Sequence, residues 1–186
     1  MATTPISALP IASGVYFLDR NRSAVTFQIR NFGFSKVRGE FTSFEARLDV
    51  GEALDSLALW ATIDTASVDT NHPKRDAHLR SSDWLDAEAH PLMSFRSTRI
   101  YPIDDIGYVL EGDLRINGIT KPVTLDVSFD GGDVHPDDGS VHAGFTATAE
   151  IRPTDFDVGL KLPLGIGKLT IGDKVKLDID AQFLAH

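Results

Sequence analysis

Cysteine is absent from this sequence of 186 residues. Its absence excludes disulfide bonds, a thiolate nucleophile and a zinc ion held by cysteine. Basic side chains are also scarce: 18 Lys and Arg stand against 27 Asp and Glu, which gives a formal net charge of −9. Nucleic acids and anionic membrane surfaces attract proteins through an excess of positive charge, so we expect neither as a partner.

Long apolar runs are missing as well. No segment approaches the roughly 20 apolar residues of a membrane-spanning helix, so we do not expect an integral membrane protein. A secretory signal begins with positive charge and continues into an apolar core. Here no basic residue precedes Asp19, and Pro5 and Pro10 interrupt the start of the chain. We therefore expect a cytoplasmic protein, or a periplasmic or extracellular one if a leader has been removed.

The chain does contain a strong alternation of apolar and polar residues. Apolar side chains at every second position are typical of a strand with one buried and one solvated face. Strict alternation occupies residues 23–30, 108–116, 123–129, 141–151 and 175–183. Looser strand patterns occupy residues 15–20, 36–50, 57–68 and 92–101.

The connections between these segments carry local signals. The apolar phase shifts between Phe41 and Phe44, which predicts a β-bulge. An Asn-Gly pair at residues 117–118 lies between two alternating runs and predicts a tight hairpin. Residues 130–140 predict a long acidic loop, and the glycine-rich residues 165–174 predict a loop at the rim of the sheet.

About eight antiparallel strands, each with one apolar face, follow from these patterns. A single open sheet would expose that face to water, so the sheet must close on itself or fold over. Several runs of about 9–11 residues suit the tilted strands of a barrel better than those of a sandwich. We therefore predict an all-β fold, an eight-stranded antiparallel barrel at residues 15–186, after a loosely ordered arm at residues 1–14.

One segment near the middle of the chain interrupts the strand pattern. Pro73 suits the start of a helix with Thr70 or Asn71 as its N-cap. About two helical turns would follow, with Leu79 pointing inward and Trp84 just beyond. A short helix cannot join the sheet, so we expect it at an end or on a face of the barrel. It would serve either as a lid over an apolar interior or as a plain connection with Trp84 in the core.

The inward-facing apolar side chains are the candidate ligand-binding residues. They are Val25, Phe27, Ile29, Leu79, Trp84, Phe95, Leu110, Leu114, Val123, Leu125, Phe145 and Leu177. The same side chains could instead fill a packed interior, because alternation does not separate a hollow barrel from a filled one. Small residues on the inner faces favour a cavity: Ala143, Ala147, Ala149 and Ala181. Tilted strands of this length would enclose a tunnel on the order of 25 Å long.

Catalytic and metal-binding patterns are not found. The sequence contains no Gly-x-Ser-x-Gly motif, no phosphate-binding loop and no dinucleotide fingerprint after a strand. His72 and His78 flank Asp76, but a spacing of six residues places the two imidazoles on different faces of a helix. We expect no catalytic residue, no cofactor and no metal site.

Three stretches resemble the YceI-like family of bacterial lipocalin-like proteins. They are TNHPKRDAHLRSSDWLDAEAHPLMSF at residues 70–95, DLRINGITKPVTL at 113–125 and AEIRPTDFDVGL at 149–160. The residues that match the family's motifs are Arg75, Asp76, Leu79, Arg80, Asp83, Trp84, Gly118, Thr120, Pro122, Arg152, Asp155 and Phe156. The chain departs from the family's usual glycine at Asp157.

The resemblance implies an eight-stranded lipocalin-like barrel that holds a long isoprenoid lipid or an isoprenoid quinone, without an established enzymatic activity, and often as a homodimer. Arg75, Arg80 and Arg152 are candidate partners for the polar head of such a ligand, although solvated or ion-paired surface arginine is the alternative for each. The alternative function is a filled barrel that acts as a protein-interaction module in a dimer.

Overall fold

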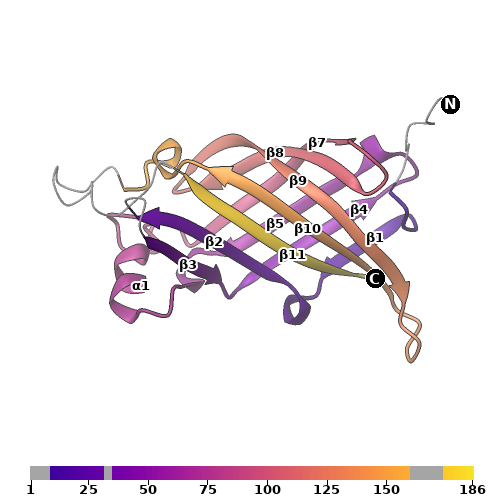
Figure 1. The fold of residues 1–186 in the computed structure, drawn as a ribbon, viewed down its shortest axis with the longest axis horizontal. Helices are drawn as coiled ribbons and strands as arrows, with labels where there is room; N and C mark the ends of the chain where they lie inside the picture. Colours follow the sequence, from indigo (N-terminus) through magenta and orange to yellow (C-terminus); the bar gives the residue numbers. More distant parts are fainter. Residues whose placement is uncertain (1–8, 32–34, 160–173) are drawn as a thin grey trace.

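The computed structural model describes residues 9–31, 35–159 and 174–186, which form a closed antiparallel barrel with one α-helix at an end (Figure 1). The strands are β1 (Gly14–Leu18), β2 (Ala24–Asn31), β3 (Ser35–Phe41), β4 (Phe44–Val50), β5 (Ala58–Asp64), β6 (Val68–Asp69), β7 (Leu92–Pro102), β8 (Gly107–Ile116), β9 (Ile119–Val134), β10 (Val141–Ile151) and β11 (Val175–Ala185). They follow the order β1-β4-β5-β7-β8-β9-β10-β11-β2-β3-β6, and a further pairing of β1 with β11 closes the barrel.

These eleven segments make eight strands because three of the strands are interrupted. β1 and β2 pair one after the other with β11, through Phe17–Leu184 and Val25–Ile179. β1 and β2 thus form one strand of the barrel. The next strand consists of β4, which pairs with β1, and β3, which pairs with β2. The strand after that consists of β5, which pairs with β4, and β6, which pairs with β3. The prediction of an eight-stranded antiparallel barrel is therefore confirmed.

The bulge predicted within residues 36–50 is wrong, because the chain leaves the sheet there and divides into β3 and β4. The backbone N–H of Thr42 donates to the carbonyl of Ser67 at 3.2 Å. Ser67 belongs to the 3₁₀ turn η3 (Thr65–Ser67), where the neighbouring strand is interrupted too. The backbone N–H of Thr42 at one break is thus paired with a carbonyl at the other break.

The Asn-Gly hairpin is confirmed between β8 and β9. Asn117 and Gly118 have φ angles of 53° and 75°. A two-residue type I′ turn needs such left-handed values at both positions. A Cβ on Gly118 would also lie 2.8 Å from Cε1 of His90, so a side chain at this position would require the His90 ring to move.

The acidic loop predicted at residues 130–140 is shorter than expected, because β9 continues to Val134 opposite β10. The pairing shifts register between Gly144 and Phe145. On the opposite strand Gly131 has a φ of 125°, which glycine adopts without steric cost. A bulge therefore absorbs the mismatch and keeps the two strands paired almost to the turn.

The arm before β1 is partly packed. Residues 1–8, and residues 165–173 of the predicted rim loop, lie outside the described part of the chain. Leu9 is only 6% exposed and belongs to a core cluster at one end of the barrel. The Tyr16 hydroxyl donates to the carbonyl of Ala12 at 2.7 Å. Leu9 and Ala12 thus contact the barrel, within the arm that the sequence predicts to be loosely ordered.

Residues 70–91, between β6 and β7, form the helical insert. It contains α1 (Pro73–Arg80), which lies at the opposite end of the barrel from the turn between β7 and β8 (Figure 1). Its N-cap is His72, not Thr70 or Asn71: the His72 Nδ1 accepts from the backbone N–H of Arg75 at 3.2 Å. No helix in residues 9–31, 35–159 and 174–186 is long and apolar enough to cross a membrane.

The 3₁₀ turn η4 (Pro153–Phe156) follows β10 and ends in a left-handed residue. This residue is Asp157, with φ 54° and ψ 22°, and its backbone N–H donates to the carbonyl of Thr154 at 3.2 Å. Phe156 beside it is only 1% exposed, so the turn is held in the barrel end. The glycine of the family pattern fits this conformation without the steric cost that a Cβ brings.

We expect Asp157→Gly to stabilise the protein by about 0.5 kcal/mol. Relief of the left-handed strain is worth about 1 kcal/mol, and the greater freedom of glycine in the unfolded chain removes part of it. Urea unfolding measures the change. Asp155→Gly is the matched control. Asp155 is exposed and lies within η4, so glycine at this position should destabilise the protein. Equal losses in both variants would contradict the prediction.

Candidate ligand-binding cavity

The interior of the barrel contains a cavity of about 270 Å³. Voids larger than a water molecule are few in a well-packed protein interior. The described side chains therefore do not fill the barrel. Ala147, Ala149 and Ala181 line the cavity as the sequence predicts, whereas Ala143 is fully buried in the packed cluster at one end.

All twelve predicted lining residues border this cavity. They are Val25, Phe27, Ile29, Leu79, Trp84, Phe95, Leu110, Leu114, Val123, Leu125, Phe145 and Leu177. The period-2 pattern places the strand members inside, and the helical insert supplies the other two. Their contact with a ligand stays a prediction.

The sequence analysis missed further wall residues. Among them are Phe41, Ile63, Leu85, Met93, Ile100, Tyr108, Phe156 and Phe183. Some lie in strands with irregular patterns, where the register of the inner face could not be assigned. Tyr108 and Phe183 lie on the apolar faces of regular strands, so the alternation could have identified them.

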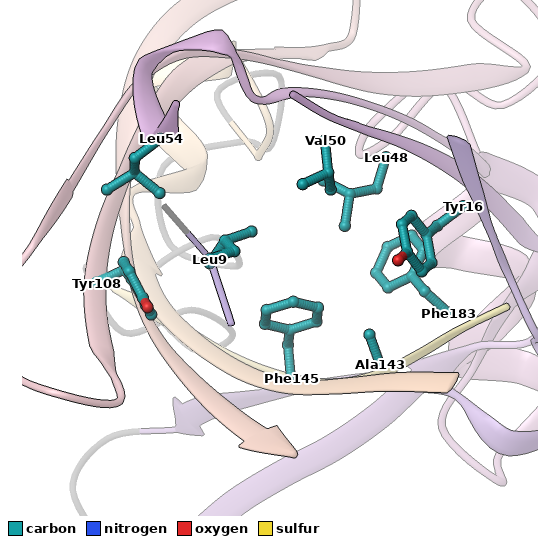
Figure 2. Close-up of a cluster of buried hydrophobic side chains, with 9 residues drawn as sticks. All are labelled: Leu9, Tyr16, Leu48, Val50, Leu54, Tyr108, Ala143, Phe145 and Phe183. Carbon is teal, nitrogen blue, oxygen red and sulfur yellow. The ribbon is translucent and has the colours of Figure 1, made fainter. Parts of the chain in front are cut away.

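The cavity runs from the α1 end to the opposite end of the barrel. Trp84 and Ile116 belong to a buried cluster at the α1 end, and both border the cavity. Leu9, Tyr108 and Phe183 border it from the cluster at the other end, whose members point into the ring of strands (Figure 2). A long, narrow ligand fits such a shape better than a compact one.

The helical insert covers one end of this cavity. Leu79, Trp84 and Leu85 border the cavity directly. The Trp84 indole N–H donates to the Nε2 of His78 at 3.2 Å, which fixes the ring against α1. The insert thus lies at an end of the cavity, as both interpretations of the segment require; its role as a lid stays a prediction.

Two of the three candidate head-group arginines are used to hold α1 on the sheet. Arg75 donates from Nε to the Thr70 hydroxyl at 2.8 Å and from Nη2 to the Thr70 carbonyl at 2.9 Å. Arg80 donates from Nε to the carbonyl of Ala66 at 2.9 Å. The third, Arg152, is exposed at the start of η4. None of them borders the cavity, so head-group binding by these residues stays a prediction.

Asp76 anchors the same end of the barrel. Its carboxylate is buried and accepts from the backbone N–H and the hydroxyl of Thr70, at 2.9 and 2.5 Å. Burial alone would raise the pKa of Asp76. Hydrogen bonds from Thr70 and His72, with the charge of Arg80, outweigh it and hold the pKa below its ordinary value. The carboxylate is therefore ionised and structural.

Polar groups on the cavity wall are few. Glu45 borders the cavity, but its side chain is 74% exposed and lies 3.8 Å from Arg20 at the outer surface. Tyr108 is fully buried, and its hydroxyl has no hydrogen-bond partner among the residues that the structure describes. Burial, and then the charge of Asp104, raise the pKa of Tyr108. The hydroxyl is thus a neutral donor.

Metal binding finds no support in the described ranges. Within them, no three His, Asp or Glu side chains gather in a group that could hold a metal ion. The prediction of no metal site and no cofactor remains an expectation.

Comparison with known proteins gives a consistent picture. A family model described as the YceI-like domain matches residues 16–183. Protein YceI of Escherichia coli O17:K52:H18 is 37% identical over 163 residues, which cover 84% of this chain and 83% of that protein. A UPF0312 protein of Ectopseudomonas mendocina is 35% identical over 146 residues, covering 77% of this chain and 76% of that protein.

Solved structures share the fold. BcnA of Burkholderia cenocepacia has a TM-score of 0.78 at 23% identity, over 89% of this chain and 98% of that one. A polyisoprenoid-binding domain from Saccharophagus degradans, implicated in plant cell wall breakdown, has a TM-score of 0.66 at 14% identity. The superposition covers 92% of this chain and 98% of that domain. At these identities the two likenesses establish the barrel architecture alone.

Proposed function

This chain belongs to the YceI-like family, and we propose that it binds a long isoprenoid lipid or an isoprenoid quinone inside the barrel without catalysing a reaction. The observation that carries the proposal is the cavity, which extends between both ends of the barrel and has almost no polar group on its wall. The structural relative from Saccharophagus degradans is described as binding polyisoprenoids, which supports the same ligand class here.

The apolar wall favours a long tail over a short one. Burial of one CH₂ group contributes about 0.8 kcal/mol, so twenty carbons contribute roughly 16 kcal/mol before costs. Association and ordering cost about 4–15 kcal/mol. A short acyl chain would barely exceed this cost, whereas a long isoprenoid exceeds it with few polar contacts. Binding is then passive, and the protein acts as a carrier, a store or a sensor of the lipid.

A homodimer is the second part of the proposal. Phe17 and Trp60 are 42% and 39% exposed on the outer face of the barrel. Both are paired with Arg47, whose guanidinium lies 5.9 Å from the centre of the Trp60 ring. Exposed aromatic and arginine side chains are typical of protein contacts, and this row favours contact with a second copy.

Mass spectrometry of freshly purified protein tests both parts. Under native conditions we expect a complex heavier than the bare chain by one lipid per barrel, and organic extraction should release an isoprenoid or a quinone. The native mass also gives the number of chains. An empty extract, together with no uptake of an added long-chain quinone, would contradict lipid binding. A single chain at micromolar concentration would contradict the dimer.

A further inference from the structure

The hydroxyl of Tyr108 is a hydrogen-bonding group without a partner among the residues that the structure describes. Tyr108 is 0% exposed and borders the cavity, yet its hydroxyl has no partner in the described ranges of the chain. Buried tyrosine hydroxyls normally find one. Tyr16, in the same cluster, shows the ordinary case, since its hydroxyl donates to the carbonyl of Ala12.

The polar side chains near Tyr108 are engaged elsewhere. The Tyr16 hydroxyl donates to the carbonyl of Ala12, and the Asp104 carboxylate, whose charge acts on Tyr108, accepts from the backbone N–H groups of Ile106 and Gly107. The cluster around Tyr108 consists of Leu9, Tyr16, Leu48, Val50, Leu54, Ala143, Phe145 and Phe183. Eight of the cluster's nine members, including Tyr108 itself, are held in strands or in the 3₁₀ turn η2 (Leu54–Ser56). An unpaired buried donor is costly, and a ligand atom that reaches the Tyr108 hydroxyl can satisfy it.

Leu9 is the member of the cluster whose side chain can be displaced together with its backbone. It precedes β1 and takes part in no strand, and in Figure 2 it stands on a short piece of chain inside the ring of strands. Its displacement would break no backbone ladder. The backbones of the other members are held in the wall of the barrel or in η2. A ligand atom can therefore reach the Tyr108 hydroxyl by replacing the Leu9 side chain.

We propose that Tyr108 is the specificity-determining donor of this site: its hydroxyl binds an oxygen of the ligand at the end of the barrel opposite α1, after Leu9 has moved aside. This rests on the proposed function, and it narrows the ligand to an isoprenoid that carries a hydrogen-bond acceptor, as the carbonyl of a quinone does. The apolar tail then runs toward Trp84 at the α1 end.

The position of the other polar groups supports this direction of binding. Arg75 and Arg80 donate to backbone carbonyls or to Thr70, and the Trp84 indole N–H already has His78 as its acceptor. On the described wall of the cavity, the Tyr108 hydroxyl is thus the donor that remains for a ligand.

The test compares two ligands of the same tail length in three variants. Ubiquinone with six isoprene units carries carbonyl oxygens, whereas squalene is an isoprenoid hydrocarbon of six units without oxygen. Displacement of bound cis-parinaric acid reports both dissociation constants. Tyr108→Phe should weaken binding of the quinone about tenfold, the loss expected for one buried hydrogen bond. Its binding of squalene should stay the same or become tighter.

Tyr16→Phe is the matched control. It removes one phenolic oxygen from the same cluster, but Tyr16 does not border the cavity, so both ligands should bind within twofold of the unchanged protein. Leu9→Ala should bind the quinone at least as tightly as the unchanged protein, because less has to be displaced.

The outcomes separate the inference from the proposed function. If the unchanged protein binds both ligands and Tyr108→Phe alters neither, the lipid-binding function stands and the role of Tyr108 is wrong. Equal losses for quinone and squalene would likewise contradict it, since they would report damage to the wall. A tenfold loss of quinone binding in Leu9→Ala would contradict the displacement of Leu9. If the unchanged protein binds neither ligand, both the inference and the proposed function fail.

Discussion

Replacing Ala147 with phenylalanine is expected to weaken binding of a long-chain isoprenoid quinone at least a hundredfold. Ala147 borders the cavity in its middle, opposite Val127 on one neighbouring strand and Ile179 on the other. A phenyl ring at this position would occupy the path of the tail. Exclusion of only four methylene groups removes about 3 kcal/mol of binding free energy, which is more than a hundredfold in the dissociation constant.

The substitution should leave the fold intact, because the ring enters an apolar space that is already empty. Quenching of tryptophan fluorescence by the quinone measures the affinity, and urea unfolding measures the stability. Thr146→Phe is the matched control: it adds the same ring one residue earlier, where the side chain is exposed on the outer face. Full binding by Ala147→Phe would show that the ligand does not pass through the middle of the barrel.

Replacing Asp76 with alanine is expected to destabilise the protein by about 2–3 kcal/mol, because the buried N–H and hydroxyl of Thr70 lose their acceptor. In a chain of this size the midpoint of thermal unfolding should fall by roughly 5–10 °C. Asp83→Ala is the control, since Asp83 is an exposed carboxylate in the same insert and lies 3.8 Å from His78. Its removal should change the stability by less than about 0.5 kcal/mol.

The contribution of Asp76 should also depend on pH. The pKa of its carboxyl in the folded protein lies below the ordinary value of 3.8, since hydrogen bonds to the carboxylate outweigh the effect of burial. The stabilisation is therefore complete above about pH 4 and is lost as the pH falls through the folded-state pKa. The difference in unfolding free energy between the unchanged protein and Asp76→Asn should shrink over that range. A difference that stays constant down to pH 2 would contradict an ionised, hydrogen-bonded carboxylate.

The regular part of the barrel was predictable because alternation is a local property of the chain. Val123 and Leu125, for example, follow a strict period of two, and the structure places both on the cavity wall. The interruptions were not predictable in this way. At the break after Phe41, the backbone N–H of Thr42 donates to the carbonyl of Ser67, and a sequence does not indicate which distant carbonyl will accept.

In the candidate site, too, the features that depend on local alternation were predictable and those that depend on distant contacts were not. The apolar wall follows from the strand pattern. No pattern in the sequence, however, distinguishes a guanidinium that binds backbone carbonyls, as that of Arg80 does, from one that faces a ligand. Leu9 carried no signal either, because one apolar residue in an arm that contains proline has no periodicity to place it. The unpaired hydroxyl of Tyr108 is visible only once its neighbours are known.

The pairing of β1 with β11 has a consequence for how the molecule is made. Tyr16 pairs with Ala185, so the first strand of the barrel meets the last. Synthesis proceeds at about 5–20 residues per second, and the earlier strands must therefore wait for many seconds with their apolar face uncovered. Contacts between such distant segments form slowly. The nascent chain is thus exposed to aggregation until β11 has been synthesised, and the cavity forms only when β11 pairs with β1.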